Sequence, residues 1–348
     1  MLNIGINGFG RIGRAIFRIN LKKDLFRIVA INDINPSNDN LAYMLKYDST
    51  YGVLDAKIDS GENSISVDNN NPIRIYHEQN ISEVPWEKHK VDIIIDSSGV
   101  NENLKFKDKL KAKGIKHQIV TNTPDSNYID KYIVLGVNEK TIEKENPFLI
   151  SSSICDASAV APVLNILNKE YEIEHGFLTT LHPWLSYQNL LDGPSRSFAY
   201  PGTIMENFSL GRSSINAIIP KTTSAIRASE KVLKFLNNKF QSLSFRVPTS
   251  IVSTADISVK LRKTTKKDEV IELFKDVEAK QKLSIIKNNE EPLVSTDFVG
   301  SEYSAIIDQR WTQSNDSNFL KLILWYDNEW GYSSRVIDLV KIISKSTL

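Results

Sequence analysis

The sequence predicts an α/β domain followed by an α+β domain, and three features carry that prediction. Short apolar, strand-like runs alternate with helical runs through about the first 150 residues, as in a doubly wound parallel sheet. After residue 155 the strand-like runs lengthen and alternate apolar with polar residues, which is typical of antiparallel strands. The chain has 348 residues, enough for two domains with substantial cores.

The elements of each half follow from these runs. In the first half we expect buried strands and one lysine-rich helix; the strands are 3–7, 26–31, 91–96, 118–121, 133–137 and 148–150, and the helix is 102–113. In the second half we expect two helices and four longer strands; the helices are 159–168 and 333–345, and the strands are 172–180, 240–246, 251–261 and 319–325. We therefore expect a parallel sheet first and a mostly antiparallel sheet second.

The first strand runs directly into a glycine-rich turn that spans residues 8–13. In such a turn Gly8 allows a tight bend, Gly10 lets backbone N–H groups approach a pyrophosphate, and Gly13 permits close packing of the next helix. The helix N-terminus adds partial positive charge for phosphates. Asp33 follows the second strand, where a carboxylate bonds the ribose hydroxyls of NAD and repels the extra phosphate of NADP. The first domain is therefore predicted to be a Rossmann domain that binds NAD.

Composition excludes several other classes of protein. A net charge of +1 gives no whole-molecule field for nucleic acids or acidic membranes. No apolar run approaches the ~18 residues of a membrane span, and the N-terminus looks like a strand rather than a signal peptide. A single cysteine excludes an internal disulfide and favours a reducing compartment, most simply the cytoplasm. We expect no metal site.

That single cysteine, Cys155, is the candidate nucleophile. It lies in a serine-rich segment, 151–158, directly after a strand and at the start of a helix. A helix N-terminus favours the thiolate, so we expect a lowered pKa for Cys155. A lone cysteine is more often a small buried hydrophobe. The serine-rich loop, the helix start and the nearby domain junction favour the catalytic interpretation.

His182 is the candidate base, because it ends the strand-like run 178–182. A neutral imidazole near Cys155 could deprotonate the thiol and later handle the proton released on oxidation. The remaining histidines have polar or charged neighbours and are predicted to be surface residues; they are His77, His89, His117 and His175.

Ordered motifs along essentially the whole chain resemble the glyceraldehyde-3-phosphate dehydrogenase family. The matching segments are 5–14, 30–33, 47–50, Cys155 with 161–162, 178–182, 192–195, 218–220, 245–249, 294–298 and 325–332. The resemblance implies a homotetramer, with an NAD-binding Rossmann domain over 1–154 and a catalytic domain over 155–326. It also implies a C-terminal segment, 327–348, whose helix returns to the NAD-binding domain.

The resemblance also implies the chemistry. Cys155 would add to the aldehyde of glyceraldehyde 3-phosphate and give a thiohemiacetal, with His182 as the base. Oxidation by NAD would leave a thioester that inorganic phosphate attacks. The matching cofactor residues are Arg11, Ile12, Asp33 and Thr121, with Asn328 on the nicotinamide carboxamide. Gly193-Pro194 resembles the NAD-preferring version, and Gln79 replaces a cofactor arginine at little cost.

The positions that would bind anions depart from the family. The family motif Ser-Cys-Thr-Thr-Asn reads Ile154-Cys155-Asp156-Ala157-Ser158 here, so two hydroxyls are lost. The threonine three residues after the histidine is Leu185, which suggests a less anionic or differently shaped substrate. The segment 196–211 looks longer than usual. In the substrate and phosphate region we expect Asp156, Thr223 (whose partner glycine is now Ser224) and Arg246, retained where the family grips the substrate phosphate.

Asp156 leaves two interpretations open. Its charge would raise the pKa of Cys155 and repel phosphate, since two like charges ~4 Å apart cost about 4 kcal/mol at an effective dielectric near 20. Alternatively, it only favours the first turn of a helix.

Three functions are therefore kept. The first is phosphorylating oxidation of glyceraldehyde 3-phosphate. The second is hydrolytic oxidation of a related sugar aldehyde such as erythrose 4-phosphate. The third is a low-activity NAD-binding interaction or redox-sensing protein.

Overall fold

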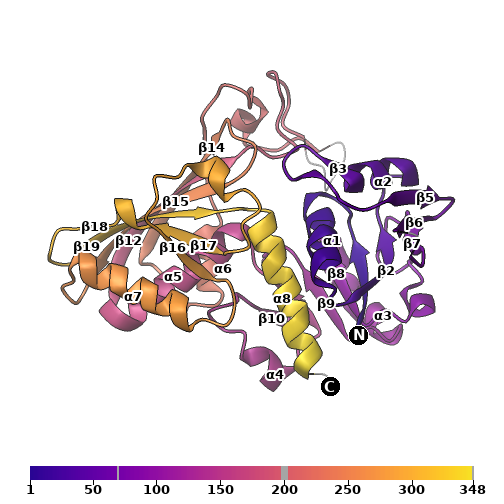
Figure 1. Cartoon of the computed structure of the whole chain (residues 1–348), viewed down its shortest axis with the longest axis horizontal. Coiled ribbons are helices and arrows are strands. Elements are labelled where there is room, and N and C mark those ends of the chain that lie inside the picture. Colours follow the sequence, from indigo (N-terminus) through magenta and orange to yellow (C-terminus); the bar gives the residue numbers. More distant parts are fainter. Residues whose placement is uncertain (69, 197–202, 347–348) are drawn as a thin grey trace. The chain divides into compact units, whose positions relative to one another are not determined.

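The computed structural model describes residues 1–68, 70–196 and 203–346, and Figure 1 labels their elements. They form two compact units. The first contains Met1–Ile133, Glu139–Ser153 and the chain from Ser333 onward; the second contains Val134–Asn138 and Ile154–Tyr332. Of the segment 196–211, residues 197–202 lie outside the described part. No helix in the described ranges is long and apolar enough to cross a membrane.

The first unit is built on a nine-stranded sheet with the order β10-β11-β9-β8-β1-β2-β7-β6-β5. The strands from β10 at one edge to β7 are parallel to one another: β1 (Asn3–Asn7), β2 (Arg27–Asn32), β7 (Ile73–Tyr76), β8 (Ile93–Asp96), β9 (His117–Val120), β10 (Lys131–Tyr132) and β11 (Leu149–Ser151). Antiparallel β5 (Ile58–Gly61) and β6 (Ser64–Val67) end one edge, and β3 (Tyr47–Asp48) pairs separately with β4 (Gly52–Val53). Isoleucines on β1 and β8 are fully buried, which confirms the predicted parallel core.

Helices α1 to α4 and most of α8 complete the first unit. Their bounds are α1 (Arg11–Lys23), α2 (Asn38–Lys46), α3 (Lys107–Ala112), α4 (Thr141–Glu145) and α8 (Trp330–Ser346), with 3₁₀ turns at Trp86–His89 and Asn101–Phe106. The predicted helix 102–113 therefore begins as a 3₁₀ turn and becomes α-helical only at Lys107.

The strand predicted at 133–137 is wrong, because the chain turns there. The Val137 N–H donates to the Val134 carbonyl at 3.1 Å, and the Val134 N–H donates to the Asn138 side chain at 2.9 Å. Gly136 has a φ of +85°, a conformation that glycine adopts without strain. The polar backbone groups are thus satisfied within the turn, and the strand of this region is the shorter β10.

The second unit is built on an eight-stranded sheet with the order β13-β14-β12-β15-β19-β17-β16, where β18 pairs with β19. The strands are β12 (Ile173–Pro183), β13 (Ile219–Lys221), β14 (Phe240–Val247), β15 (Ser253–Leu261), β16 (Ile286–Asn289), β17 (Ala305–Asp308), β18 (Gln313–Ser314) and β19 (Phe319–Tyr326). Two of its pairings, β12 with β14 and β16 with β17, are parallel and the others are antiparallel. The predicted fold class, a Rossmann domain with a mostly antiparallel second sheet, is confirmed.

Helix α5 (Cys155–Tyr171) packs on this second sheet against β12, β15 and β17. Its alanines and aliphatic residues are buried almost throughout, as expected of a helix pressed on a sheet. The other helices are α6 (Ala225–Glu230) and α7 (Lys267–Lys280), with 3₁₀ turns at Phe208–Gly211, Lys234–Leu236, Ser295–Phe298 and Gln309–Trp311. The apolar anchoring of α5 fixes the position of its first residue, Cys155.

The glycine-rich turn of the first unit has the geometry that its sequence predicts. Gly8 has a φ of +88°, and a Cβ there would lie 2.6 Å from the Ser98 backbone. A Cβ on Gly13 would lie 2.4 Å from the Gly8 carbonyl oxygen, so only glycine allows the helix to pack this closely. A Cβ on Gly10 would meet nothing within 4 Å. Positions 8 and 13 therefore have no room for a side chain, whereas position 10 is open to a ligand or a Cβ atom.

This contrast gives a stability prediction. Gly8→Ala should lower the free energy of unfolding by about 2–4 kcal/mol, because it combines a strained φ with a backbone clash. Gly10→Ala is the matched control and should change it by less than about 1 kcal/mol. Urea unfolding followed by circular dichroism measures both. Equal stability of the two variants would contradict the assigned turn geometry.

Candidate active site

Cys155 is the first residue of α5, as predicted. The residue before it, Ile154, is extended, with φ −129° and ψ 163°, and its side chain makes no capping hydrogen bond. The first-turn N–H groups of α5 therefore lack a side-chain cap from Ile154, next to the thiol. Cys155 as a whole residue is partly exposed at the helix start.

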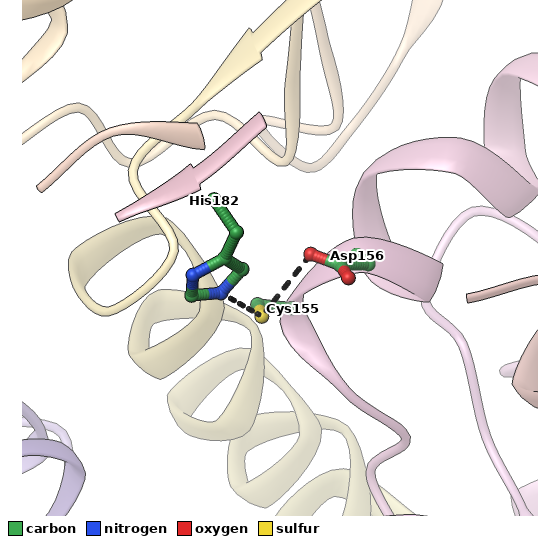
Figure 2. A group of neighbouring side chains, drawn as sticks. All are labelled: Cys155, Asp156 and His182. Atoms are coloured by element: carbon green, nitrogen blue, oxygen red, sulfur yellow. Dashed lines mark hydrogen bonds between the residues drawn. The ribbon is translucent and has the colours of Figure 1, made fainter. Parts of the chain in front are cut away.

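His182 lies beside the thiol, as predicted, near the end of β12 (Figure 2). Its Nε2 is 3.9 Å from the Cys155 sulfur. Its Nδ1 is 2.8 Å from the Pro183 carbonyl oxygen. Since a carbonyl can only accept, Nδ1 carries the proton and Nε2 presents its lone pair to the thiol. Burial, followed by the charge of Arg246, lowers the pKa of His182 to about 4. The imidazole is therefore neutral near pH 7.

Asp156 contacts the same sulfur, so that the sulfur has both the carboxylate and the imidazole as neighbours (Figure 2). The thiol is 3.6 Å from the Asp156 Oδ1. The Tyr326 hydroxyl donates to the same oxygen at 2.8 Å, and the Thr223 hydroxyl lies 3.5 Å from Oδ2. Asp156 is buried. Its carboxylate thus belongs to the site as well as to the first turn of α5.

The thiol has a raised pKa, so the lowering expected from the helix start alone is wrong, whereas the raising expected from the Asp156 charge is confirmed. Desolvation raises the pKa of Cys155 well above its ordinary value, and the charge of Asp156 raises it further. Arg246 and the backbone N–H of Asp156 favour the thiolate but are weaker. The helix start is therefore outweighed by desolvation and by a like charge in contact. The resting pair is a neutral thiol beside a neutral imidazole.

The register of three strands brings two cations to the face that carries His182. On β12 and β14, His182 is paired with Arg246, and on β14 and β13, Arg246 is paired with Ile219 and Ser244 with Lys221. Directly paired residues share a face, and so do residues two apart on a strand. Lys221 and Arg246 are therefore diagonal neighbours. Burial and the charge of Arg246 lower the pKa of Lys221, while Asp156 and Cys155 oppose that shift.

Arg246 has a buried N–H donor that makes no hydrogen bond within the described residues. It is buried, and its Nη2 lies 3.4 Å from the Tyr187 hydroxyl. Its Nε is buried and has no hydrogen-bond partner among the described residues. A buried guanidinium N–H without a partner is costly, which favours an anionic ligand at this position.

Sequence reasoning missed three residues of this site: Tyr187, Lys221 and Tyr326. Tyr326 lies within the quoted segment 325–332, yet its link to a carboxylate 170 positions earlier has no local signal. Lys221 is a charged residue directly after the apolar run 218–220, which was the available hint. Of the other histidines, His117 is buried and bonds the Pro147 carbonyl, so its surface prediction is wrong.

The first unit supplies the candidate nucleotide-binding residues. The Phe9 N–H donates to the Asp33 carboxylate at 2.6 Å, which ties the glycine turn to the end of β2. Arg11 pairs with Asp48 at 2.5 Å and lies over the Tyr51 ring. Thr121 follows β9, and its N–H donates to the Asp96 carbonyl at 3.1 Å.

Two further features of the described residues fit a dinucleotide. Helix α1 has the open Gly10 as its N-cap, with no side-chain cap, and Ile12 follows in the first turn. A helix start without a side-chain cap suits a pyrophosphate, because its first-turn N–H groups point toward the ligand. In the second unit, the side-chain oxygen of Asn328 is buried and has no hydrogen-bond partner among the described residues. An orphaned amide oxygen of this kind suits a carboxamide donor.

Comparison with known proteins agrees with this geometry. The family pattern described as "Glyceraldehyde 3-phosphate dehydrogenase, NAD binding domain" matches residues 2–104, and the one described as "Glyceraldehyde 3-phosphate dehydrogenase, C-terminal domain" matches residues 154–328. The first unit thus contains an NAD-binding domain of this family.

Similar whole proteins come from several kingdoms. The chain is 37% identical over 346 residues to glyceraldehyde-3-phosphate dehydrogenase 3 of Saccharomyces cerevisiae, across 99% of this chain and 100% of the yeast protein. It is 35% identical over 345 residues to the glyceraldehyde-3-phosphate dehydrogenase of Phytophthora infestans, across 99% and 100% of the two chains. It is 36% identical over 349 residues to the cytosolic enzyme of Mesembryanthemum crystallinum, across 99% and 98%. The chain therefore belongs to the glyceraldehyde-3-phosphate dehydrogenase family of NAD-dependent dehydrogenases.

Proposed function

We propose that this chain oxidises a phosphorylated aldehyde, glyceraldehyde 3-phosphate, through a thioester on Cys155, with inorganic phosphate as the acyl acceptor. The observation that carries the proposal is the 3.9 Å approach of a neutral His182 to the Cys155 sulfur at the start of α5. Family membership supplies the substrate class. We also propose residues 1–154 as the NAD-binding domain, 155–326 as the catalytic domain and 327–348 as the segment whose helix returns to the first.

The cofactor would be held by groups that fit its parts. Gly8, Gly10 and Gly13, with the backbone of Arg11 and Ile12 at the start of α1, would bind the pyrophosphate. Asp33 would bind the ribose, with Thr121 nearby, and Asn328 would orient the nicotinamide carboxamide. When bound, NAD supplies the acceptor for a hydride.

The chain's own residues handle the bonds and protons at sulfur. Since both groups rest neutral, His182 Nε2 takes the thiol proton as the sulfur attacks the carbonyl carbon. The imidazolium then passes this proton to the carbonyl oxygen, which gives a neutral thiohemiacetal on Cys155 and leaves Nε2 free again. The hydroxyl proton of the thiohemiacetal leaves to the imidazole as the hydride departs, and a thioester remains. Phosphate then attacks that carbonyl, the carbon–sulfur bond breaks, and the sulfur regains its proton from His182. The raised pKa of Cys155 makes the base essential, because little thiolate exists beforehand.

Two cations, the retained Arg246 and Lys221, accompany the positions at which hydroxyl groups are lost. Lys221 and Arg246 lie on the His182 face, and the Thr223 hydroxyl lies beside Asp156. Two cations face one carboxylate, which leaves an excess of positive charge for an anion. Asp156 opposes phosphate at close range, so we propose that Lys221 and Arg246 offset its repulsion.

A hydrolytic reaction is the second candidate, favoured by one specific contact. The Asp156 carboxylate lies 3.6 Å from the sulfur that would carry the acyl group. A carboxylate so close to a thioester could accept a proton from an attacking water. The product would then be a carboxylic acid rather than an acyl phosphate, and an aldehyde such as erythrose 4-phosphate would suit the same site. The third candidate, a low-activity NAD-binding protein, would require the cysteine–histidine pair to be idle.

Family membership and one exposed apolar surface support our proposals for the oligomeric state and the cellular location of the protein. Phe177 and Leu181 on β12 and Leu243 on β14 are 66%, 40% and 42% exposed on the face away from His182. Exposed apolar side chains clustered on one sheet face are typical of a protein interface. We propose a homotetramer, and a cytoplasmic location as in the relative named cytosolic.

The first test is NADH formation from NAD and glyceraldehyde 3-phosphate, with and without phosphate. We expect turnover that depends on phosphate, and Asp156→Thr should lower the KM for phosphate roughly tenfold because a like charge is removed. An unchanged KM in that variant would restrict Asp156 to its helix-turn role. Phosphate-independent turnover would establish hydrolysis. The absence of any NADH burst would reject both reactions and favour the third candidate, a low-activity NAD-binding protein.

The role of His182 is tested by His182→Asn. The pre-steady-state rate of NADH formation should fall by about 10²- to 10⁴-fold, because the thiol then loses its base. His175→Asn is the matched control, since His175 is an exposed histidine on the same strand, and it should leave the burst unchanged. A normal burst with Asn at position 182 would remove His182 from this role.

The assembly is tested by sedimentation of the 39.4 kDa chain. The wild type should sediment as a tetramer, and Phe177→Glu should produce smaller species because it places a charge in an apolar interface. Tyr128→Glu, at an exposed aromatic residue of the first unit, is the control and should remain tetrameric. A monomeric wild type, or a tetramer that survives Phe177→Glu, would contradict the assigned interface.

A further inference from the structure

We propose that Cys155, Asp156 and His182 form a binding site for a thiophilic divalent cation such as Zn²⁺, and that the bound ion holds the protein in a reversible inactive state. One sulfur, one carboxylate oxygen and one imidazole nitrogen lie within 4.8 Å of one another. No spacing in the sequence indicates a metal site, because two of the ligands are adjacent and the third is 27 positions from Cys155. Only the contact between α5 and β12 assembles the set.

The distances suit a tetrahedral ion. Zinc bonds of about 2.3 Å to sulfur and 2.0–2.2 Å to nitrogen or oxygen place a sulfur roughly 3.5–3.6 Å from either atom. The observed separations are 3.9 Å from sulfur to the His182 Nε2 and 3.6 Å from sulfur to the Asp156 Oδ1. Rotation of the Asp156 carboxylate would bring its oxygen and Nε2 together around the ion. Three protein ligands would then leave a fourth position open for water.

The outer contacts are those that orient metal ligands. Histidine ligands usually donate their other ring N–H to a carbonyl or carboxylate, and His182 donates its Nδ1–H to the Pro183 carbonyl. Carboxylate ligands are likewise hydrogen-bonded, and Asp156 accepts from Tyr326 at 2.8 Å, with Thr223 at 3.5 Å. Nε2 therefore already presents its lone pair toward the sulfur, without a change of tautomer.

The charges around the site set its selectivity. Asp156 favours a cation, whereas Lys221 and Arg246 oppose one. A metal that binds thiolate strongly overcomes this opposition better than one that prefers oxygen, so Zn²⁺ is favoured over Mg²⁺ or Ca²⁺. On binding, the sulfur–hydrogen bond breaks, a sulfur–zinc bond forms, and the proton passes to solvent. No electron is transferred, and removal of the ion restores the thiol.

The bound ion would occupy the sulfur lone pair that attacks the aldehyde. Inhibition thus rests on the proposed function, whereas metal binding does not. The two are separated by following the thiol directly. Cys155 is the only cysteine in the chain, so alkylation by iodoacetamide, read by mass, reports this one site.

The experiment measures the rate of Cys155 alkylation in the full-length protein with and without Zn²⁺. The rate of each variant in Zn²⁺ is compared with the rate of the same variant without metal. In the wild type we expect saturating Zn²⁺ to slow alkylation at least tenfold, and EDTA to reverse the effect. In Asp156→Asn and His182→Asn the Zn²⁺ concentration for half protection should rise about 10- to 100-fold. His175→Asn is the matched control and should be protected like the wild type. Co²⁺ should give a thiolate-to-cobalt charge-transfer band in the wild type and in His175→Asn, whereas Asp156→Asn and His182→Asn should need a higher Co²⁺ concentration to give it.

Several outcomes would overturn the proposal. These are no protection by Zn²⁺, equal protection of Asp156→Asn and the wild type, or equal loss of protection in His175→Asn and His182→Asn. Asp156→Thr serves if the asparagine variant does not fold, since threonine also removes the carboxylate. Protection without any loss of dehydrogenase activity would retain the metal site and reject the inactive state.

Discussion

The contact between the Asp156 carboxylate and the Cys155 thiol is the constraint on which the rest of the site depends. Burial of the thiol and, after it, a negative charge 3.6 Å from the sulfur oppose the thiolate, so the helix start does not produce a resting ion pair with His182. The carboxylate in turn requires a donor, which Tyr326 supplies at 2.8 Å. It also requires nearby positive charge, which Lys221 and Arg246 provide. Cys155 and His182 therefore form a neutral acid–base pair, and their charged neighbours are Asp156, Lys221 and Arg246.

The scaffold explains why these groups meet. Helix α5 is anchored by an apolar face, so its first two residues are held near His182 at the end of β12. Strands β12, β14 and β13 place His182, Arg246 and Lys221 on one face through their register. A shift of one residue in any of these strands would turn its side chain to the opposite face. The strand register therefore sets the positions of His182, Arg246 and Lys221, and the start of α5 sets those of Cys155 and Asp156.

The sequence predicted the features that are local. The glycine turn, the buried strands that flank it and the placement of Cys155 at a helix start all depend on residues within a few positions of one another. The strand predicted at 133–137 failed because Gly136 and the Asn138 side chain satisfy the backbone in a turn. The prediction for His117 failed because polar neighbours in sequence say little about burial.

The features that depend on long-range contacts could not be predicted from the residues themselves. The hydrogen bond from Tyr326 to Asp156 joins residues 170 positions apart. Lys221 shares a sheet face with His182 only because β13 pairs with β14 in this register. The lowered thiol pKa expected from the helix start was wrong for the same reason, because burial by tertiary packing has no local signal; only the contribution of the adjacent Asp156 could be predicted from the sequence. The approach of His182 to Cys155 was expected chiefly because of the family resemblance, and the fold now gives its cause.

The pKa of Cys155 is the most direct measure of this account, and the pH dependence of alkylation at this single cysteine reports it. The account predicts a pKa above the ordinary thiol value of about 8.5, and a lower value in Asp156→Asn, where the opposing charge is removed. A thiol that is fully ionised at neutral pH, or a pKa that Asp156→Asn does not lower, would contradict it.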